Sequence, residues 1–541
     1  MKKRTFAAVL AVLLLLSSFA ACGQQDTDPA PPTAQENGAA NGDPAVQDTP
    51  GEPREIVVRA LGDPFSFTPN FMPDEMGYEV HQNLFSRLVK LDVSKSEPIP
   101  DLAESWHYSD DVMTLTFYLR QNAYWHDGVP VTSADVKYTF DTIMANPTYF
   151  FNSSMAIVDS IEAPDDHTVI FHLNTPDASF VAFLGWYATF ILPKHIYDVG
   201  IPWADNPAGQ NPIGSGPFMF YSYSEGESVI LQRFPDYFEG PAALDRVIFA
   251  IIPDEATAVQ ALLNGEIDFM SNIPPASLPE LQAHPHLNVF MDEWPSPIRL
   301  VFNMEDELAG NLAVRRAIAY AINRDQISTM AYFGLYTPEY NMYPSFVAWA
   351  TNNEDTAPSL NVEAGIQMLE DAGFERRADG YFFDFELDYF PMLTGGVETA
   401  LLLQSQLSAV GIRLELNSLE IMAYIMRAEA GEFQMHLISG FLGPDPSAYV
   451  MRFGSGLATN WGRYANAEFD EYIMRGNSVA DQAQRAIYYR AAQRIMAEEL
   501  PQIPLVNVIN IEAAWDHFIN LPIHGEGRWG WQEWTFTDIV S

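Results

Sequence analysis

The chain has 541 residues, of which 48% are hydrophobic and 18% are charged, so it is long and apolar enough for two or three packed domains. Acidic residues outnumber basic ones 71 to 28, which gives a formal net charge of −43 at pH 7. This charge repels phosphate backbones and anionic lipid headgroups, so it argues against nucleic acid and membrane surfaces as partners. We interpret it as a solvated acidic surface; a preference for a cationic ligand is the alternative.

The first 22 residues have the pattern of an export signal. Three basic residues at positions 2–4 precede the apolar stretch 6–16, which is too short for an ordinary membrane-spanning helix. The only cysteine, Cys22, directly follows two alanines, and this arrangement resembles the lipobox of bacterial lipoproteins. The resemblance implies cleavage before Cys22 and a diacylglycerol group on its sulfur; a plain secretory signal is the alternative. A lone cysteine also excludes an intrachain disulfide framework.

Residues 23–54 form the next segment, which is rich in Gln, Asp, Pro, Ala, Gly and Asn. A segment of this composition cannot bury enough apolar surface to fold, so we predict a flexible tether. The ordered fold is expected to begin near Ile56.

Period-two alternation marks the first strands of the folded part. Residues 113–120 and 167–173 alternate apolar and polar side chains, which is typical of half-buried strands. Between them, Thr132 and Asp135 have the spacing of a helix capping box. Residues 218–223 and 229–234 are predicted to form a hairpin.

The later part of the chain alternates between helix and strand patterns. We predict a helix over 254–263 and a strand over 266–270, then strands over 385–390, 412–416 and 433–439 that are separated by helices over 398–409 and 421–430. This β-α-β-α-β order predicts parallel strands with right-handed crossovers in an open α/β sheet. The cleft of such a sheet lies at the carboxyl ends of its strands.

Several motifs occur in an order that resembles one protein family. The longest block runs from Trp106 through Trp125-His-Asp-Gly128 to Phe140. It is followed by Pro212-Ile-Gly-Ser-Gly-Pro-Phe218, Ala261-Leu-Leu-Asn-Gly-Glu-Ile-Asp268, Val314–Arg324, Leu407–Ile412, Gly443-Pro-Asp-Pro446 and Pro501–Leu505. From about Ile56 to its end, the chain is similar to the peptide/nickel-type bacterial extracellular solute-binding proteins, family 5.

The resemblance implies a periplasmic-binding-protein-like type II α/β fold with two hinged lobes. Lobe I would comprise 55–90, 210–297 and 508–541, with an inserted subdomain at 91–209, and lobe II would comprise 298–507. The resemblance also implies a monomeric, non-enzymatic receptor that closes over an oligopeptide or dipeptide and delivers it to the permease of an ABC importer. Neither a cofactor nor a metal is expected. Oligosaccharide or nickel binding within the same family, a sensory receptor and a secreted hydrolase remain alternatives.

Candidate ligand contacts are a carboxylate, an arginine and aromatic side chains near predicted strand or loop ends. In the resembled family a carboxylate in the loop that corresponds to Ser439–Pro446 holds the ligand's ammonium group, which makes Asp445 a candidate, although Asp before Pro also favours a turn. Arg299 is a candidate partner for a ligand carboxylate. The further candidates are Phe441, Asn460, Trp461, Trp186, Tyr187, Trp294 and Trp349. An ordinary core or surface role is the alternative for each of them.

Signs of catalysis are weak. His126 and Asp127 are adjacent, but neighbouring side chains point apart and no nucleophile lies nearby in sequence. Gly214-Ser215-Gly216 is too short for a phosphate-binding loop, so we interpret it as a crossing between domains. Arg315 and Arg316 are predicted to lie on the solvated face of their helix.

Overall fold

The computed structural model describes residues 53–71, 75–92, 97–186, 189–343, 347–440, 445–457, 459–523 and 533–540. The chain separates into a unit at 1–52 and a folded body at 53–541. The predicted signal, Cys22 and nearly all of the tether therefore lie outside the described residues.

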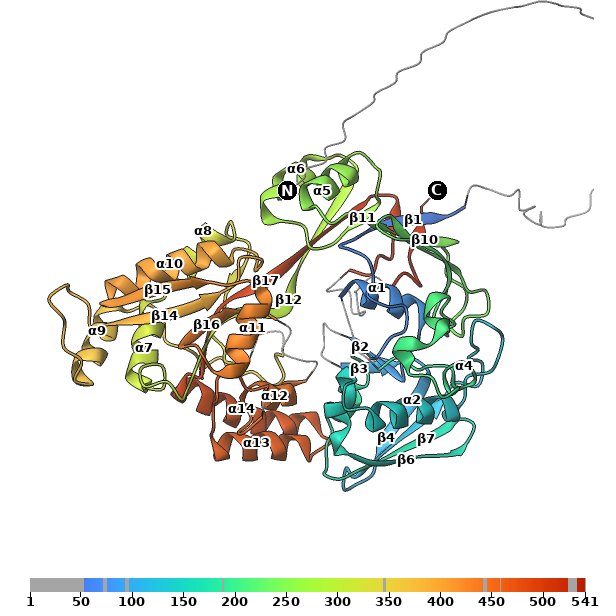
Figure 1. Cartoon of the computed structure of the whole chain (residues 1–541), viewed down its shortest axis with the longest axis horizontal. Helices are drawn as coiled ribbons and strands as arrows, with labels where there is room; N and C mark the ends of the chain where they lie inside the picture. Colours follow the sequence, from blue (N-terminus) through green and yellow to red (C-terminus); the bar gives the residue numbers. More distant parts are fainter. Residues whose placement is uncertain are drawn as a thin grey trace, which may run out of the picture. The chain divides into compact units, whose positions relative to one another are not determined.

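An eleven-stranded mixed sheet runs through the folded body (Figure 1). The main path has the order β15-β14-β16-β12-β17-β11-β1-β10-β9-β8, and β13 pairs with β17. The strands are β1 (Glu55–Ala60), β8 (Phe218–Ser224), β9 (Ser228–Arg233), β10 (Arg246–Ile251), β11 (Phe269–Met270), β12 (Leu287–Phe302), β13 (Thr337–Pro338), β14 (Phe383–Tyr389), β15 (Ile412–Ser418), β16 (Met435–Ile438) and β17 (Gln502–Trp515).

Two long antiparallel strands, β12 and β17, join the two halves of this sheet, and we call this pair the crossover (Figure 1). One end of the pair contacts β11, where Phe269 lies opposite Ala514. The other end contacts β16, where Arg299 lies opposite Ile438. The register of the β12–β17 pair shifts between Trp294 and Ile298, so the regular ladder is interrupted between the two halves.

A separate four-stranded antiparallel sheet has the order β4-β5-β7-β6. It consists of β4 (Ala103–Tyr108), β5 (Thr114–Leu119), β6 (Val158–Asp165) and β7 (Thr168–Leu173). The predicted strand alternation is confirmed here, because Leu115, Phe117 and Leu119 are all buried. The remaining strand pairs are β2 (Val89–Asp92) with β3 (Glu97–Pro100) and β18 (Phe518–Ile519) with β19 (Asp538–Ile539).

Many of the helices begin at a residue whose side chain caps them. In α2 the Thr132 amide donates to the Asp135 carboxylate at 2.8 Å, which confirms the predicted capping interaction. The α-helices are α1 (Glu75–Leu84), α2 (Ser133–Ala145), α3 (Phe180–Phe183), α4 (Lys194–Tyr197), α5 (Glu255–Leu263), α6 (Leu278–Ala283), α7 (Leu312–Ala321), α8 (Arg324–Ala331), α9 (Val362–Asp371), α10 (Gly396–Ala409), α11 (Ile421–Ala430), α12 (Tyr449–Phe453), α13 (Ala467–Asn477) and α14 (Gln482–Glu499).

The predicted parallel α/β segment is confirmed. β14 pairs in parallel with both β15 and β16, and α10 and α11 lie between them in sequence. The 218–234 hairpin is confirmed as β8 and β9. The strand predicted over 266–270 is shorter than expected, because only Phe269 and Met270 pair with neighbouring strands.

The prediction for Arg315 is wrong. This side chain is 3% exposed, and its guanidinium donates to the carbonyl oxygens of Glu499 and Ala309. Glu499 ends α14, so the cation satisfies carbonyl groups at a helix C-terminus. Arg316 donates to the Glu498 carbonyl from a more exposed position.

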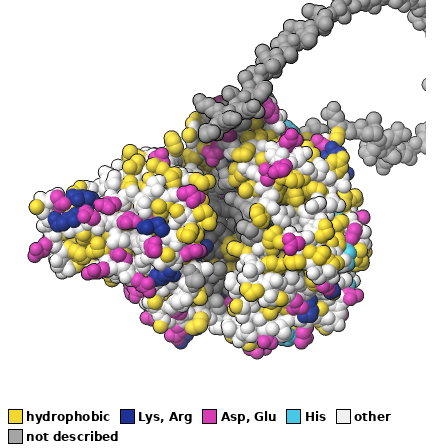
Figure 2. Space-filling view, in the orientation of Figure 1, with side chains coloured by type: hydrophobic (Ala, Val, Ile, Leu, Met, Phe, Trp, Pro, Cys, Tyr) yellow, Lys and Arg dark blue, Asp and Glu magenta, His cyan; other side chains and the backbone are white. Residues whose placement is uncertain are grey.

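Buried apolar side chains form separate cores around the crossover. Among the described residues, the buried members of one core all lie between Ile298 and Val506. A second is built mainly from residues 56–249 together with chain-terminal residues such as Phe518 and Trp534, and a smaller one lies around α5 and α6. Carboxylate side chains are spread over both halves of the visible surface in Figure 2, which agrees with a solvated acidic surface.

Candidate functional site

A cavity of about 240 Å³ lies at the crossover. Ser296 and Ile298 of β12 line it together with Val508–Ile511 of β17. Leu393, Thr394 and Ser439, which follow β14 and β16, complete this side of its wall. The cavity therefore lies at the carboxyl ends of parallel strands, where an α/β sheet places its cleft.

Arg299 follows the cavity-lining Ile298 on β12 and is buried, with 4% of its surface exposed. Its Nη1 donates to the carbonyl oxygens of Pro297 at 3.2 Å and Gly440 at 3.4 Å, while its Nε has no acceptor among the described residues. Burial lowers the pKa of Arg299 to about 10, so it remains a cation at neutral pH. The crossover therefore carries a buried positive charge.

His436 of β16 brings Arg299 and Trp461 into one neighbourhood. The imidazole is 1% exposed and stacks on the Phe433 ring at 4.5 Å, and the Trp461 ring approaches it edge-on at 6.0 Å. Burial, followed by the charge of Arg299, lowers the pKa of His436 to about 3. The histidine is therefore neutral and adds no charge next to Arg299.

Asp445 has contacts within the protein. Its Oδ1 accepts from the Ser447 amide at 3.0 Å and from Arg485 Nη2 at 2.7 Å, and both side chains of the ion pair are buried. The Arg485 guanidinium also lies over the Trp349 ring at 5.4 Å. The structure thus brings Asp445 and Trp349 together, because Arg485 contacts both of them. The Asp445 carboxylate is already paired with Arg485 within the protein.

The other predicted contacts lie apart from these groups or outside the described residues. Asn460 is buried, and its side chain bonds the backbone of Gly454 and Tyr464. Trp186 packs against Phe183 with their ring centroids 6.3 Å apart. Tyr187 and Phe441 are outside the described residues, as is the side chain of Trp294, whose backbone belongs to β12.

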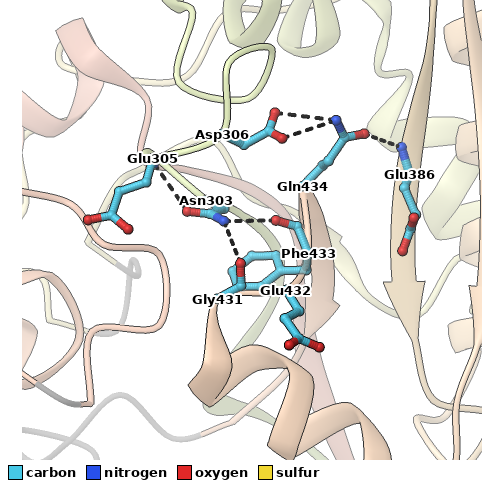
Figure 3. Close-up of a pocket in the computed structure, with 8 residues that line it drawn as sticks. All are labelled: Asn303, Glu305, Asp306, Glu386, Gly431, Glu432, Phe433 and Gln434. Carbon is cyan, nitrogen blue, oxygen red and sulfur yellow. Dashed lines mark hydrogen bonds between the residues drawn. The ribbon is translucent and has the colours of Figure 1, made fainter.

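A larger cavity of about 400 Å³ is lined by polar residues (Figure 3). Asn303 Nδ2 donates to the carbonyl oxygens of Gly431 and Phe433, each at 2.9 Å, and Gln434 Nε2 donates to Asp306 at 3.3 Å. Because these polar groups are already hydrogen-bonded to one another, we interpret the cavity as a structural feature of the fold. Within the described ranges, no group of three or more His, Cys, Asp or Glu side chains is placed to hold a metal ion.

Three relevant residues were missed by the sequence reasoning. His436 lies on the strand paired with that of Arg299, the charge of Arg452 acts on Arg299, and Arg485 neutralises Asp445. The basic residue in the otherwise apolar run Tyr449–Phe453 was an available signal for Arg452. The sequence contains no such signal for Arg485, since its partner Asp445 lies in a different part of the chain.

A match to a family model identifies the family of this chain. The model described as "Bacterial extracellular solute-binding proteins, family 5 Middle" matches residues 97–461, which is more than half of the chain. The chain belongs to this family. Family 5 proteins are extracytoplasmic substrate-binding receptors, so the predicted recognition is confirmed.

The similarity to named relatives and solved structures covers most of this family 5 protein. The dipeptide-binding protein of Escherichia coli is 26% identical over 83% of this chain and 88% of its own. The substrate-binding protein CtaP of Listeria monocytogenes superposes with a TM-score of 0.82 at 25% identity, covering 90% of this chain and 99% of CtaP. AppA of Bacillus subtilis, solved with a nonapeptide, has a TM-score of 0.76 at 25% identity over 91% of this chain and 100% of its own.

These similarities confirm the predicted type II periplasmic-binding-protein fold. Across the described part of this family 5 chain, no helix has the length and apolar character needed to cross a membrane.

Proposed function

We propose that this family 5 protein is the extracytoplasmic receptor of an ABC importer, and that it captures oligopeptides or dipeptides and releases them unchanged to the permease. The family membership of the chain carries this proposal. One relative is named for dipeptide binding, and another was solved with a bound nonapeptide. Monomeric action without catalysis is part of the same proposal.

The crossover supports a hinge between two lobes. Lobe II, 298–507, would contain the core built from residues between Ile298 and Val506, and lobe I would contain 55–90, 210–297 and 508–541, with the subdomain 91–209 inserted. Among the described strands, only β12 and β17 link the two halves of the large sheet, and their register shifts near Ile298. A change in backbone torsion at that point would rotate one lobe against the other.

Arg299 and Trp461 are the ligand contacts that we favour among the predicted residues. A buried cation at the crossover suits a ligand carboxylate, and an indole offers stacking area with a polar edge. Asp445 and Asn460 already bond other groups of the protein, so we propose structural roles for them.

The N-terminal anchor is a separate part of the proposal. Acylated Cys22, followed by the tether 23–54, would hold the receptor at the outer face of the cell membrane. A Cys22→Ser variant should move the protein from the membrane fraction to the soluble fraction, and intact-mass analysis of the mature wild-type chain should show a lipid-modified N-terminal cysteine. A soluble wild-type protein with an unmodified cysteine would contradict the anchor without affecting ligand capture.

A thermal-shift panel of peptides against oligosaccharides tests the ligand class. A bound peptide should stabilise the fold by about 2.7 kcal/mol when its concentration is a hundredfold above Kd. Chromatography after incubation should recover the peptide intact. If oligosaccharides alone raise the melting temperature, or if the peptide is cleaved, the proposed function is wrong.

A further inference from the structure

A hydrogen bond joins the two proposed lobes at a point away from the crossover. The backbone amide of Ala178 donates to the backbone carbonyl of Asn477 at 2.7 Å. Ala178 belongs to the inserted subdomain 91–209, between β7 and α3, and Asn477 is the last residue of α13 in lobe II. Figure 1 shows α13 close to this subdomain and well below the crossover strands. The bond therefore spans the two lobes without being part of the proposed hinge.

On the lobe II side, α14 holds the end of α13 that accepts this bond. The Tyr489 hydroxyl donates to Asn477 Oδ1 at 2.8 Å. Arg485 Nε donates to the carbonyl oxygen of the preceding residue, Gly476, at 3.1 Å, and its Nη2 is paired with Asp445 at 2.7 Å. Gly476 packs so closely that an added Cβ would lie 2.6 Å from the Tyr489 ring. The accepting carbonyl is therefore fixed by contacts within lobe II.

On the other side, the turn that carries Ala178 is also fixed. The Asp177 carboxylate accepts from the backbone amide of Ser179 at 2.8 Å and from its hydroxyl at 2.5 Å. The Tyr108 hydroxyl of β4 accepts from the amide of Val181 at 3.2 Å. Ala178 and Ser179 are both buried. Two preorganised groups thus meet in a contact that is shielded from water, so little conformational entropy is lost when the bond forms.

Opening of the lobes would have to break this bond. A ligand can enter only if the lobes rotate about the crossover, and a rotation displaces groups in proportion to their distance from its axis. A hydrogen bond is lost after a displacement of about 1 Å, so Ala178 and Asn477 would separate early in the motion. The net contribution of one such bond corresponds to about a 5-fold change in an equilibrium constant. This bias is large enough to influence opening and small enough to permit it.

We propose that Ala178 and Asn477 form a latch, which favours the closed arrangement of the lobes and opens whenever a ligand enters or leaves. This inference rests on the proposed function, since a latch on ligand exchange presupposes a receptor that opens and closes. Tyr489 and Arg485 are positioning residues of the latch, because they hold the end of α13. The latch sets the rate of ligand exchange as well as the equilibrium between open and closed forms.

A reversible covalent link across the contact tests the latch. The latch variant, Ala178→Cys/Asn477→Cys, is made in a Cys22→Ser background, which leaves no other thiol in the chain. Residues joined by a backbone hydrogen bond have Cα atoms about 5 to 6 Å apart, within the range of a disulfide. Bound tritium-labelled alanine peptides of two to five residues are then chased with unlabelled peptide. The oxidised protein should release them at least about 10-fold more slowly than the reduced protein, because the opening motion gates release.

Two controls separate the latch from general effects of substitution. Ser224→Cys/Ser228→Cys in the same background links β8 to β9 within lobe I, and its oxidation should leave the release rate unchanged. Ala178→Pro removes the donor N–H in a turn that tolerates proline and should speed release about 5-fold. Ala178→Ser keeps the amide and should match the wild type. Equal release by the oxidised and reduced latch variant, or by Ala178→Pro and Ala178→Ser, would overturn the latch.

Failure of the proposed function would give a different pattern. If no peptide binds, the peptide assignment falls, and the latch is then judged by small-angle X-ray scattering of the unliganded protein. A smaller radius of gyration for the oxidised than for the reduced latch variant retains the latch. Equal radii refute it.

Discussion

The backbone amide of Ala178 donates to the backbone carbonyl of Asn477 at 2.7 Å. This bond connects the segment after β7 with the C-terminal end of α13. Three charged groups lie near this bond. Burial raises the pKa of Asp177, and the charges of Asp445 and Arg485 also act on this carboxyl group. Besides the crossover, this bond is therefore a second contact within the folded body, between the part that contains β7 and the part that contains α13.

Removal of Arg485 should destabilise this region strongly. Arg485→Met leaves the Asp445 carboxylate buried without its cation, so we expect a loss of about 3 to 5 kcal/mol in the free energy of unfolding, measured by urea denaturation. The matched double variant Asp445→Asn/Arg485→Met removes both charges and should lose less than Arg485→Met alone. A loss below about 1 kcal/mol in the single variant would show that the pair is not important for stability.

A methyl group at Gly214 should be poorly tolerated. A Cβ atom there would lie 1.8 Å from the Leu84 carbonyl oxygen, so the backbone itself would have to move. We expect Gly214→Ala to lower the free energy of unfolding by about 3 kcal/mol or more, or to prevent folding. Gly62→Ala is the control, because its Cβ would meet only the flexible Met76 side chain at 3.7 Å, and this variant should fold normally.

His81 should make stability fall as the pH is lowered. Burial lowers its folded-state pKa from 6.5 to about 4, although its Nε2 bonds the Ser66 carbonyl at 2.8 Å. Between these two pKa values the unfolded chain binds the proton more readily, so stability is lost as the pH falls below 6.5. From pH 7 to pH 5 the wild type should lose about 2 kcal/mol more than His81→Gln, measured by denaturation at each pH. Parallel pH profiles would contradict this assignment.

Local sequence patterns predicted much of the fold. The period-two run at β5, the hairpin of β8 and β9 and the helix Ile421–Ala430 could be located because neighbouring residues alone define them. The pairing of β12 with β17 was not predicted, since it joins Leu287 to Trp515 across the whole later part of the chain. Such pairing leaves no periodic signal within either strand.

The site was only partly predictable for the same reason. Arg299 was identified from its position just after the predicted lobe boundary at 297–298, but its burial depends on packing between β12, β16 and neighbouring helices. Asp445 looked available for a ligand until the fold placed Arg485 at 2.7 Å from it. Arg315 lies on the helix face that the pattern assigned to solvent, yet carbonyl groups at the end of α14 cover it.

Native mass spectrometry of the protein incubated with a mixed library of short peptides is the decisive test of peptide capture. We expect a 1:1 complex whose bound peptide is released at its original mass. A protein that binds no library peptide, or that releases shortened products, would contradict capture and unchanged delivery.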